Sequence, residues 1–391
     1  MTQTVLLGDI AKIKGGKRLP KGEVLQETQN THPYLRIVDM GEKFIKKTSL
    51  QYVPDDVFPK ISRYITNTND VLLSIVGTIG LVAVVDEGLD NASLTENCVK
   101  LTCDPGKVDP EFLYYFLTSS VGQDEIRAGR VGSTQPKLPL YNIAKIRIPS
   151  LPLGEQRKIA DILGAIDEKI ELNRQMNETL EQMGQALFRH YFIDNREAEK
   201  WRDGVIADLG AVITGKTPSK AKAEYYGDDV MFLKVPDMHG QSIIIKTEDM
   251  LSSTGASSQS KKYIPKWSTC VSCIATVGVV SLVGEKLQTN QQINSIVPKS
   301  KEYALHNYYL MKSKSEIIKT MASGGSATPN LNKGHFENIK VKLPPIETLG
   351  KFQGEAESLM EMVYKNTRQI QTLTTLRDTL LPRLINGKVK V

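Results

Sequence analysis

Two cysteines give the chain its clearest spacing for metal or redox chemistry. Cys270 and Cys273 form a Cys-x-x-Cys motif, which in other settings binds zinc or exchanges disulfides. The motif lies inside the apolar run 269–275, which reads as a β-strand, and buried thiols behave as small hydrophobic side chains. We therefore expect structural cysteines here, with no metal or redox role.

The histidines do not suggest a metal site either. Each one stands alone, without the short spacing that two ligands of one ion usually have. The histidines of the chain are His32, His190, His239, His306 and His335. We expect them on the surface or in turns, and we expect no bound metal.

Several common catalytic motifs are missing from the sequence. There is no Gly-x-x-x-x-Gly-Lys-Ser/Thr phosphate loop and no His-Glu-x-x-His motif. The Pro344-Pro345 pair follows Leu343 and precedes Ile346, so it is not the Asn/Asp-Pro-Pro-aromatic loop of an amino-methyltransferase. A nuclease would need a cluster of carboxylates, and Asp55 with the aspartate after it is only weak evidence for one. We predict no catalytic centre and no cofactor in this chain.

Binding to a polyanion is better supported than catalysis. Near the start of the chain, basic residues are spaced by Gly15 and Gly16, so backbone amides could approach phosphates while the side chains neutralise them. A solvated basic turn would look similar. The candidates in this loop are Lys14, Lys17 and Arg18, and those in the matching later loop are Lys216, Thr217 and Lys220.

A second pair of loops, residues 127–137 and 322–333, carries side chains that can read base edges. Arg, Gln and Asn make paired hydrogen bonds in the major groove, and Ser and Thr serve bases or phosphates. The candidates in the first loop are Arg130, Ser133, Thr134, Gln135 and Lys137. Those in the second are Ser323, Ser326, Thr328, Asn330, Asn332 and Lys333. Four further candidates lie at matched positions in neighbouring apolar runs: Arg36, Thr78, Lys234 and Thr276.

These loops recur because the chain is an internal duplication. Apolar alternation typical of strands appears twice in the same order, and each copy ends in a proline turn. The matched strand-like runs are 34–40 with 232–238, 71–80 with 269–278, and 146–149 with 341–344.

After each proline turn the apolar period changes to about three and a half, which predicts a long helix. The first helix should run from about Gly154 to Phe192, roughly 58 Å at 1.5 Å per residue. The core-type positions of the two helices match after a shift of 193 residues, including Met183 with Leu376 and Asn173 with Asn366. One buried Asn per helix would fix register in a coiled coil. The alternative is two helices that each pack on their own domain.

The expected fold is therefore α+β, with two tandem β-rich domains separated by two long antiparallel coiled-coil helices and related by a pseudo-twofold repeat. The predicted boundaries are 1–150 for the first domain, 151–194 for the first helix, 195–344 for the second domain, and 345–391 for the second helix and tail. The net charge of +6 and the pI near 8.9 favour a polyanionic partner. With no long apolar stretch and no signal sequence, a cytoplasmic protein is expected.

The start of the first helix carries the most specific pattern. Residues 151–163 read Leu-Pro-Leu-Gly-Glu-Gln-Arg-Lys-Ile-Ala-Asp-Ile-Leu, and residues 376–389 read Leu-Arg-Asp-Thr-Leu-Leu-Pro-Arg-Leu-Ile-Asn-Gly-Lys-Val. With the duplication, they resemble the specificity subunit of type I restriction-modification enzymes. The second helix start, residues 345–352, departs from the pattern because it lacks the Glu-Gln pair.

The resemblance implies two target recognition domains on double-stranded DNA and the docking of two methyltransferase subunits, with restriction subunits in the full complex. S-adenosylmethionine, ATP and Mg²⁺ would then belong to the partner subunits. Because the two recognition loops differ, we expect each domain to read one half of an asymmetric bipartite site, with the helices setting the spacing. The rival interpretations are a protein adaptor without DNA binding and a self-contained methyltransferase.

Overall fold

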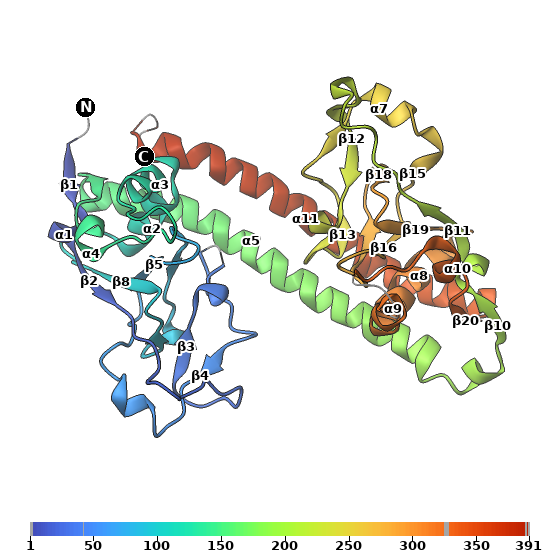
Figure 1. The fold of residues 1–391 in the computed structure, drawn as a ribbon, viewed down its shortest axis with the longest axis horizontal. Coiled ribbons are helices and arrows are strands. Elements are labelled where there is room, and N and C mark those ends of the chain that lie inside the picture. The colour runs from blue at the N-terminus through green and yellow to red at the C-terminus, as the bar shows by residue number, and fades with distance from the viewer. Residues whose placement is uncertain (1–2, 42, 324–327, 388, 390–391) are drawn as a thin grey trace. The chain divides into compact units, whose positions relative to one another are not determined.

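The structure of the protein is a computed structural model, which describes residues 3–41, 43–323, 328–387 and 389. The chain forms two compact units, and both long helices run through both units (Figure 1). Unit 1 comprises residues 1–170 and 372–391, and unit 2 comprises residues 171–371. Each unit therefore contains one β-rich domain with a segment of each long helix.

Unit 1 is built on a four-stranded antiparallel sheet in the order β2-β8-β5-β6. Its strands are β2 (Ala11–Gly15), β8 (Cys98–Cys103), β5 (Val71–Ser74) and β6 (Val82–Val84). A smaller sheet joins β4 (Gln51–Tyr52), β3 (Pro33–Leu35) and β7 (Ser93–Leu94), and β1 (Thr4–Leu6) pairs with β9 (Arg147–Pro149). The helices of this domain are α1 (Leu7–Ile10), α2 (Pro110–Thr118), α3 (Ser120–Ala128) and α4 (Leu140–Ile143).

Unit 2 repeats this plan with the sheet order β11-β19-β16-β17 and one added strand, β13. These strands are β11 (Gly210–Thr214), β19 (Ile293–Pro298), β16 (Thr269–Ser272), β17 (Val280–Val283) and β13 (Ile243–Ile244). The second sheet contains β14 (Met250–Leu251), β12 (Tyr226–Leu233), β18 (Leu287–Thr289) and β15 (Tyr263–Ile264), and β10 (Arg202–Val205) pairs with β20 (Lys340–Leu343). Its helices are α6 (Val235–Met238), α7 (Ser253–Ser257), α8 (Ala304–Ser313), α9 (Ser315–Ala322) and α10 (Lys333–Glu337).

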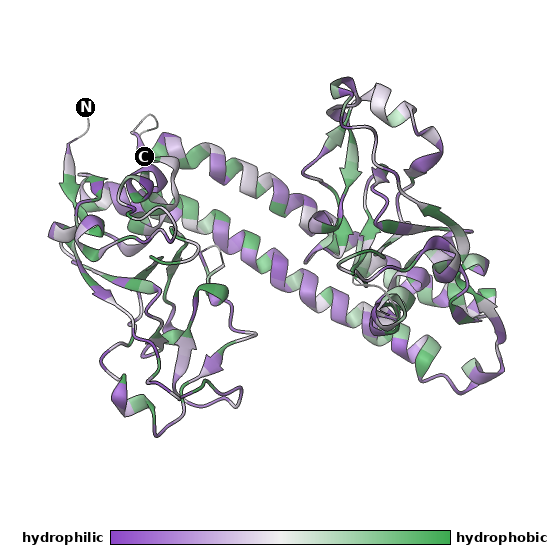
Figure 2. Cartoon of the chain, viewed as in Figure 1, coloured by the Kyte–Doolittle hydropathy of each residue, from purple (hydrophilic) through white to green (hydrophobic). Residues whose placement is uncertain are grey.

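The two long helices are α5 (Leu153–Phe188) and α11 (Ile346–Ile385), and polar and apolar residues alternate along both (Figure 2). In unit 1, Ile159 and Leu163 of α5 share one core with Leu384 of α11. In unit 2, Leu180 of α5 shares a core with Met360 of α11. The start of α5 therefore packs with the end of α11 and the end of α5 packs with an earlier part of α11, so the helices run antiparallel in each unit. The predicted α+β fold, with its duplicated domains and long helices, is confirmed.

A polar layer interrupts the apolar seam in unit 2. The Asn173 Nδ2 atom donates to Gln369 Oε1 at 2.9 Å, and the Asn366 Nδ2 atom donates to Asn177 Oδ1 at 3.0 Å. Asn173 and Asn366 are both buried, but each bonds to a different residue of the facing helix, and they do not bond to each other. Their role in fixing the helix register stays a prediction.

Three details differ from the sequence expectations. Met183 and its counterpart Leu376, both expected in the seam, are 49% and 45% exposed, because a 3.6-residue helix drifts away from a seven-residue repeat. The strand expected over residues 34–40 ends early, since the Asp39 carboxylate accepts the Arg36 backbone N–H and starts a 3₁₀ turn. In the second copy Asp237 does the same and starts α6.

The position of His306 corrects the expectation that the histidines lie on the surface or in turns. Its ring is 2% exposed on α8 and packs 4.8 Å from the Phe192 ring, between centroids. Burial lowers the pKa of His306 to about 4, because the charged form would lose its hydration among aromatic rings. The imidazole is therefore an uncharged part of the core of unit 2.

We predict that His306 makes the stability of unit 2 depend on pH. Below pH 6.5 the unfolded chain takes up a proton at His306 and the folded chain does not, so stability falls until about pH 4. The loss should reach about 3 kcal/mol over this window and should be missing in His306→Phe. Urea denaturation followed by tryptophan fluorescence reports on unit 2, because both tryptophans, Trp201 and Trp267, lie in it.

The control for this measurement is His239→Phe, which changes an exposed histidine of the same unit and should keep the wild-type pH dependence. Parallel pH curves for the wild type and His306→Phe would contradict the assignment.

Candidate nucleic-acid interface

The first candidate loop of each copy leaves the end of the first strand of its sheet. In unit 1, the backbone N–H of Gly16 donates to Cys98 O at 3.0 Å, and that of Lys17 donates to Leu94 O at 2.8 Å. In unit 2, Gly215 and Lys216 make the equivalent bonds to Ile293 O and Thr289 O, at 3.2 and 2.9 Å. The two loops therefore start on the same backbone frame.

Glycine is required at the first residue of both loops. A Cβ atom on Gly16 would lie 2.0 Å from Thr95 O, and one on Gly215 would lie 2.1 Å from Asn290 O. Both distances are much shorter than a van der Waals contact. Because the neighbouring oxygen belongs to the backbone and cannot turn away, a side chain at either glycine would force the loop away from the sheet.

The turn that follows β5 in unit 1, and the turn that follows β16 in unit 2, lie at the same end of the sheet as the first loop. The Ile75 backbone N–H donates to Asn97 O at 2.8 Å, next to the bond that anchors Gly16. Inside the turn, the Ser74 hydroxyl oxygen accepts the Leu81 N–H at 2.8 Å, and in unit 2 Ser272 accepts the Val279 N–H at 2.9 Å. One serine thus holds the same turn closed in both copies.

The second candidate loop packs directly on this turn. In unit 1, the Val131 and Lys137 backbones exchange hydrogen bonds of 2.9 and 3.0 Å, and Leu138 N–H donates to Ile75 O at 3.0 Å. In unit 2, Leu331 N–H donates to Cys273 O at 2.8 Å. The structure therefore brings the two loops that the sequence suggested separately to one end of the sheet in each unit. We call these loops with their turn the sheet-end surface.

Side chains at matched positions of the two sheet-end surfaces have different chemistry. In unit 1, Arg18 Nε lies 2.5 Å from Glu96 Oε1, a charged pair with the arginine side chain 80% exposed. In unit 2, the Thr217 hydroxyl donates to Gln291 Oε1 at 2.6 Å, a neutral pair. The backbone frame is shared, whereas the groups offered to a ligand are not.

Most of the predicted residues are exposed or half-buried, in these loops or, for Lys14, in the strand β2 that leads into one. In unit 1 they are Lys14, Lys17, Arg18, Thr78, Ser133, Thr134, Gln135 and Lys137. In unit 2 they are Lys216, Thr217, Lys220, Thr276, Ser323, Thr328 and Asn330. Ser326 lies outside the described residues.

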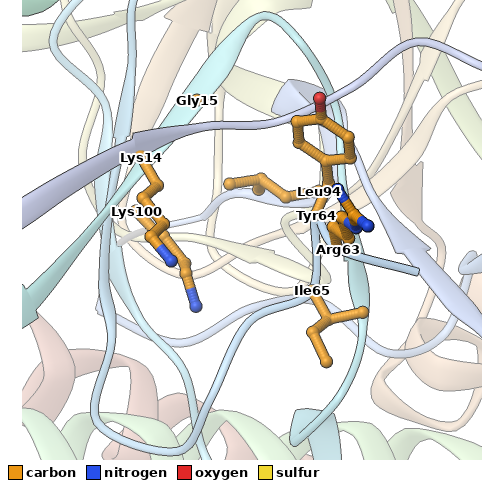
Figure 3. A pocket seen from close by; sticks show the side chains of 7 residues that line it. All are labelled: Lys14, Gly15, Arg63, Tyr64, Ile65, Leu94 and Lys100. Carbon is orange, nitrogen blue, oxygen red and sulfur yellow. The ribbon is translucent and has the colours of Figure 1, made fainter. Parts of the chain in front are cut away.

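Several residues of this interface were missed by the sequence analysis. Glu96 and Gln291 precede the second strand of each sheet, and matching the two copies across that turn would have found them. Arg63 and Tyr64 line a cavity with Lys14 (Figure 3) and come from a segment with no sequence motif. Only the folded sheet brings that segment beside the first loop.

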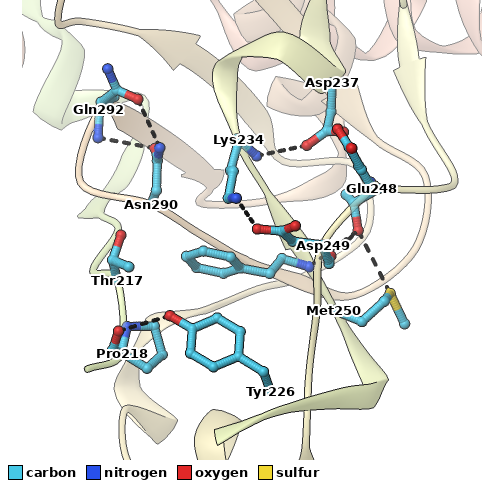
Figure 4. A network of polar contacts seen from close by, with 12 residues as sticks. Thr217, Pro218, Tyr226, Lys234, Asp237, Glu248, Asp249, Met250, Asn290 and Gln292 are labelled. Carbon is cyan, nitrogen blue, oxygen red and sulfur yellow. Dashed lines mark hydrogen bonds and ion pairs between the residues drawn. The ribbon is translucent and has the colours of Figure 1, made fainter. Parts of the chain in front are cut away.

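Other predicted residues have partners within the protein, which favours structural roles for them. The Arg36 guanidinium binds Asp39 at 3.0 Å and also donates to Ser49 O at 2.9 Å. Lys234, the equivalent residue of unit 2, forms an ion pair with Asp249 (Figure 4). Arg130 Nη2 donates to Ile79 O at 2.9 Å and so braces the turn.

Two predicted residues at the end of the second loop also hold structure. The Asn332 side-chain oxygen accepts the His335 backbone N–H at 2.9 Å and caps α10, and Lys333 forms an ion pair with Glu337 at 3.2 Å.

Cys270 and Cys273 are buried thiols. The Cys270 Sγ atom lies 3.3 Å from Ser295 Oγ, and burial raises the pKa of both Cys270 and Cys273 to about 12. Among the described residues, no three His, Cys, Asp or Glu side chains are grouped as metal ligands would be. None of the described helices has the length and hydropathy of a membrane span.

The duplicated fold, with two differing loop surfaces on matching sheets and two long helices, defines a protein that presents two related but unequal candidate binding surfaces. The sequence matches the family model of the type I restriction modification DNA specificity domain over residues 2–182 and again over residues 198–376. The chain belongs to this family, and the resemblance inferred from its sequence is confirmed.

Among its relatives, the specificity subunit of the type I restriction enzyme HindI from Haemophilus influenzae is 33% identical, over 92% of this chain and 95% of the relative. The MjaIX specificity subunit from Methanocaldococcus jannaschii is 25% identical, over 90% and 82%. The crystal structure of a type I S subunit from M. genitalium shares the fold, with a TM-score of 0.63 and 17% identity over 98% of this chain and 95% of that one.

We predict that Gln135→Ala changes base preference in one half-site only. The Gln135 side chain is exposed at the sheet-end surface of unit 1, so its loss should leave the fold intact. Losing one base contact should cost roughly 1 to 3 kcal/mol for the preferred base and little for the others. The measurement is competition binding with duplexes substituted base by base.

Thr328→Ala is the matched variant in unit 2 and should affect the other half-site. Arg130→Ala tests the same loop of unit 1 as Gln135→Ala, although it also removes the hydrogen bond to Ile79 O that braces the turn. An equal loss of affinity on all sequences would assign the residue to phosphate contacts and contradict base reading.

Proposed function

We propose that this chain is the DNA-reading subunit of a type I restriction-modification complex and that each unit reads one half of a bipartite site. The observation that carries the proposal is the pair of sheet-end surfaces. They share backbone hydrogen bonds, glycines and serine-held turns, and they differ at Arg18–Glu96 against Thr217–Gln291. Two domains that share a backbone arrangement but carry different side chains are suited to recognising two different half-sites.

The proposal gives α5 and α11 two tasks. They set the number of base pairs between the half-sites, and they dock two methyltransferase subunits through helix surface that the target recognition domains leave uncovered. Large apolar side chains that are exposed on these helices, such as Leu172 at 51% and Met362 at 47%, support a docking role.

Chemistry in this proposal belongs to the partner chains. The methyltransferase subunits bind S-adenosylmethionine and methylate adenine, and restriction subunits use ATP and Mg²⁺ to cut unmethylated DNA. The relatives are named as specificity subunits, which supports a subunit without catalysis of its own. Because host DNA is the substrate, the complex would act in the cytoplasm.

Methylome sequencing of a host that expresses this chain with its methyltransferase subunit tests the proposal. The expected result is one modified motif made of two different half-sites separated by a fixed spacer. A palindromic motif would contradict the reading of different halves, and no new modification would contradict the function.

The same assay tests the spacing role with a matched deletion of residues 171–177 and 366–372, one heptad from each helix. This deletion shortens both helices by roughly 10 Å and keeps the seven-residue repeat in phase. We expect the same half-sites with fewer base pairs between them. An unchanged spacer in a folded, active variant would contradict the role of the helices in spacing.

A further inference from the structure

A cationic cavity of about 190 Å³ lies beside the first loop of unit 1. Figure 3 shows Lys14 and Lys100 next to each other on one side of the cavity, with Arg63 and Tyr64 on the other. Lys14 and Lys100 are directly opposed in the β2–β8 ladder, where two like charges repel. The repulsion between these two lysines destabilises the sheet unless a negatively charged group compensates for it.

The protein itself supplies only part of that compensation. Lys100 is held by Asp70 Oδ2 and Asn67 Oδ1, each 3.0 Å from its Nζ atom. Across the described residues, neither Lys14 nor Arg63 has a carboxylate within ion-pair distance. Three cations against one carboxylate leave the cavity with a charge of +2, and the Tyr64 hydroxyl can add a hydrogen-bond donor.

Unit 2 has no opposed lysine pair at the matched place. The ladder position of Lys14 opposite Lys100 is occupied there by Ile213 opposite Ser295. The basic residue before the repeated Tyr-Ile pair is Lys262, whose Nζ atom donates to Thr214 O at 2.9 Å. Lys286 Nζ also lies 4.2 Å from the centroid of the Tyr263 ring, so unit 2 keeps basic residues near this tyrosine. The opposed lysine pair is specific to unit 1 and is therefore not a requirement of the fold.

The size of the cavity favours a small anion. It is smaller than the roughly 300 Å³ at which pockets for organic ligands begin, and Gly15 lies on its wall, where a backbone can be approached closely. Lys17 and Arg18 leave the same strand end two and three residues later, so the cavity continues the sheet-end surface. A phosphate of a duplex held on that surface would lie within reach.

We propose that the cavity formed by Lys14, Arg63, Tyr64 and Lys100 binds one backbone phosphate of the half-site read by unit 1, and that unit 2 has no counterpart. The inference rests on the proposed function and adds a difference between the halves: unit 1 contributes a phosphate clamp that does not depend on sequence. Binding to the first half-site then depends more on salt than binding to the second.

The test measures duplex binding by the full chain with its methyltransferase subunits as salt is varied. Each neutralised phosphate adds about 0.9 to the slope of log K against log salt concentration. We expect the double variant Lys14→Gln/Arg63→Gln to lower the magnitude of this slope by about 0.9 and to weaken all sequences alike. The matched control in unit 2, Lys262→Gln, should keep the wild-type slope.

A neutral methylphosphonate moved along the first half-site locates the contact. One position should weaken wild-type binding and leave the double variant unaffected. A decrease of about 1.8 in the slope would mean contacts to two separate phosphates, and an unchanged slope would mean no contact. Either result overturns the inference, whereas the proposed function still stands if the wild-type complex binds the duplex. A wild-type complex that binds no duplex would overturn both.

A free anion is the other source of the same chemistry, and inorganic phosphate is its probe. Calorimetric titration of the full chain should show no saturable binding of phosphate at submillimolar concentration. Stoichiometric binding that is lost in the double variant, together with an unchanged DNA slope, would assign the cavity to a small anion and overturn the inference.

Discussion

The close approach of two chain segments at the end of each sheet is the constraint on which the rest of the structure depends. Gly16 and Gly215 lie so close to a neighbouring backbone carbonyl that no side chain fits, and the residues after them are held by backbone bonds. The course of each loop is therefore set by backbone atoms and does not depend on the side chains that the loop carries. Side chains such as Arg18 and Thr217 can then differ between the copies without moving the backbone frame, so the frame is separate from the side chains that we propose read DNA.

A second constraint ties each domain to the helices through buried polar groups. In unit 1 the Tyr115 hydroxyl of α2 donates to Asp167 at 2.7 Å, and Asp167 also pairs with Arg377 at 2.9 Å. In unit 2 the Tyr308 hydroxyl of α8 donates to Glu181 at 3.0 Å. Because a buried carboxylate without partners is costly, these contacts fix where each domain docks on the helix pair. A defined spacing between half-sites needs such fixed docking.

The sequence predicted the parts of this arrangement that rest on repetition and periodicity. The duplication, the long helices and the two polar loops were visible because each recurs with a regular spacing. The helix α2 was not, since residues 112–117 form a continuous apolar run that is buried throughout, and periodicity cannot tell such a short run from a buried strand. The role of Arg36 also depended on folding, because its carboxylate partner is identified only once Asp39 caps a turn. Residues such as Glu96 become candidates only when the sheet brings their turn to the loops.

The central claim is that two equivalent frames carry different reading groups. It is tested most directly by a chimera in which residues 195–344 also replace residues 1–150, so that both domains carry the second set of side chains. Methylome sequencing of a host that expresses this chimera with the methyltransferase subunit should show two identical half-sites, each matching the half read by unit 2. A modified motif that keeps the original, unequal halves would contradict the account.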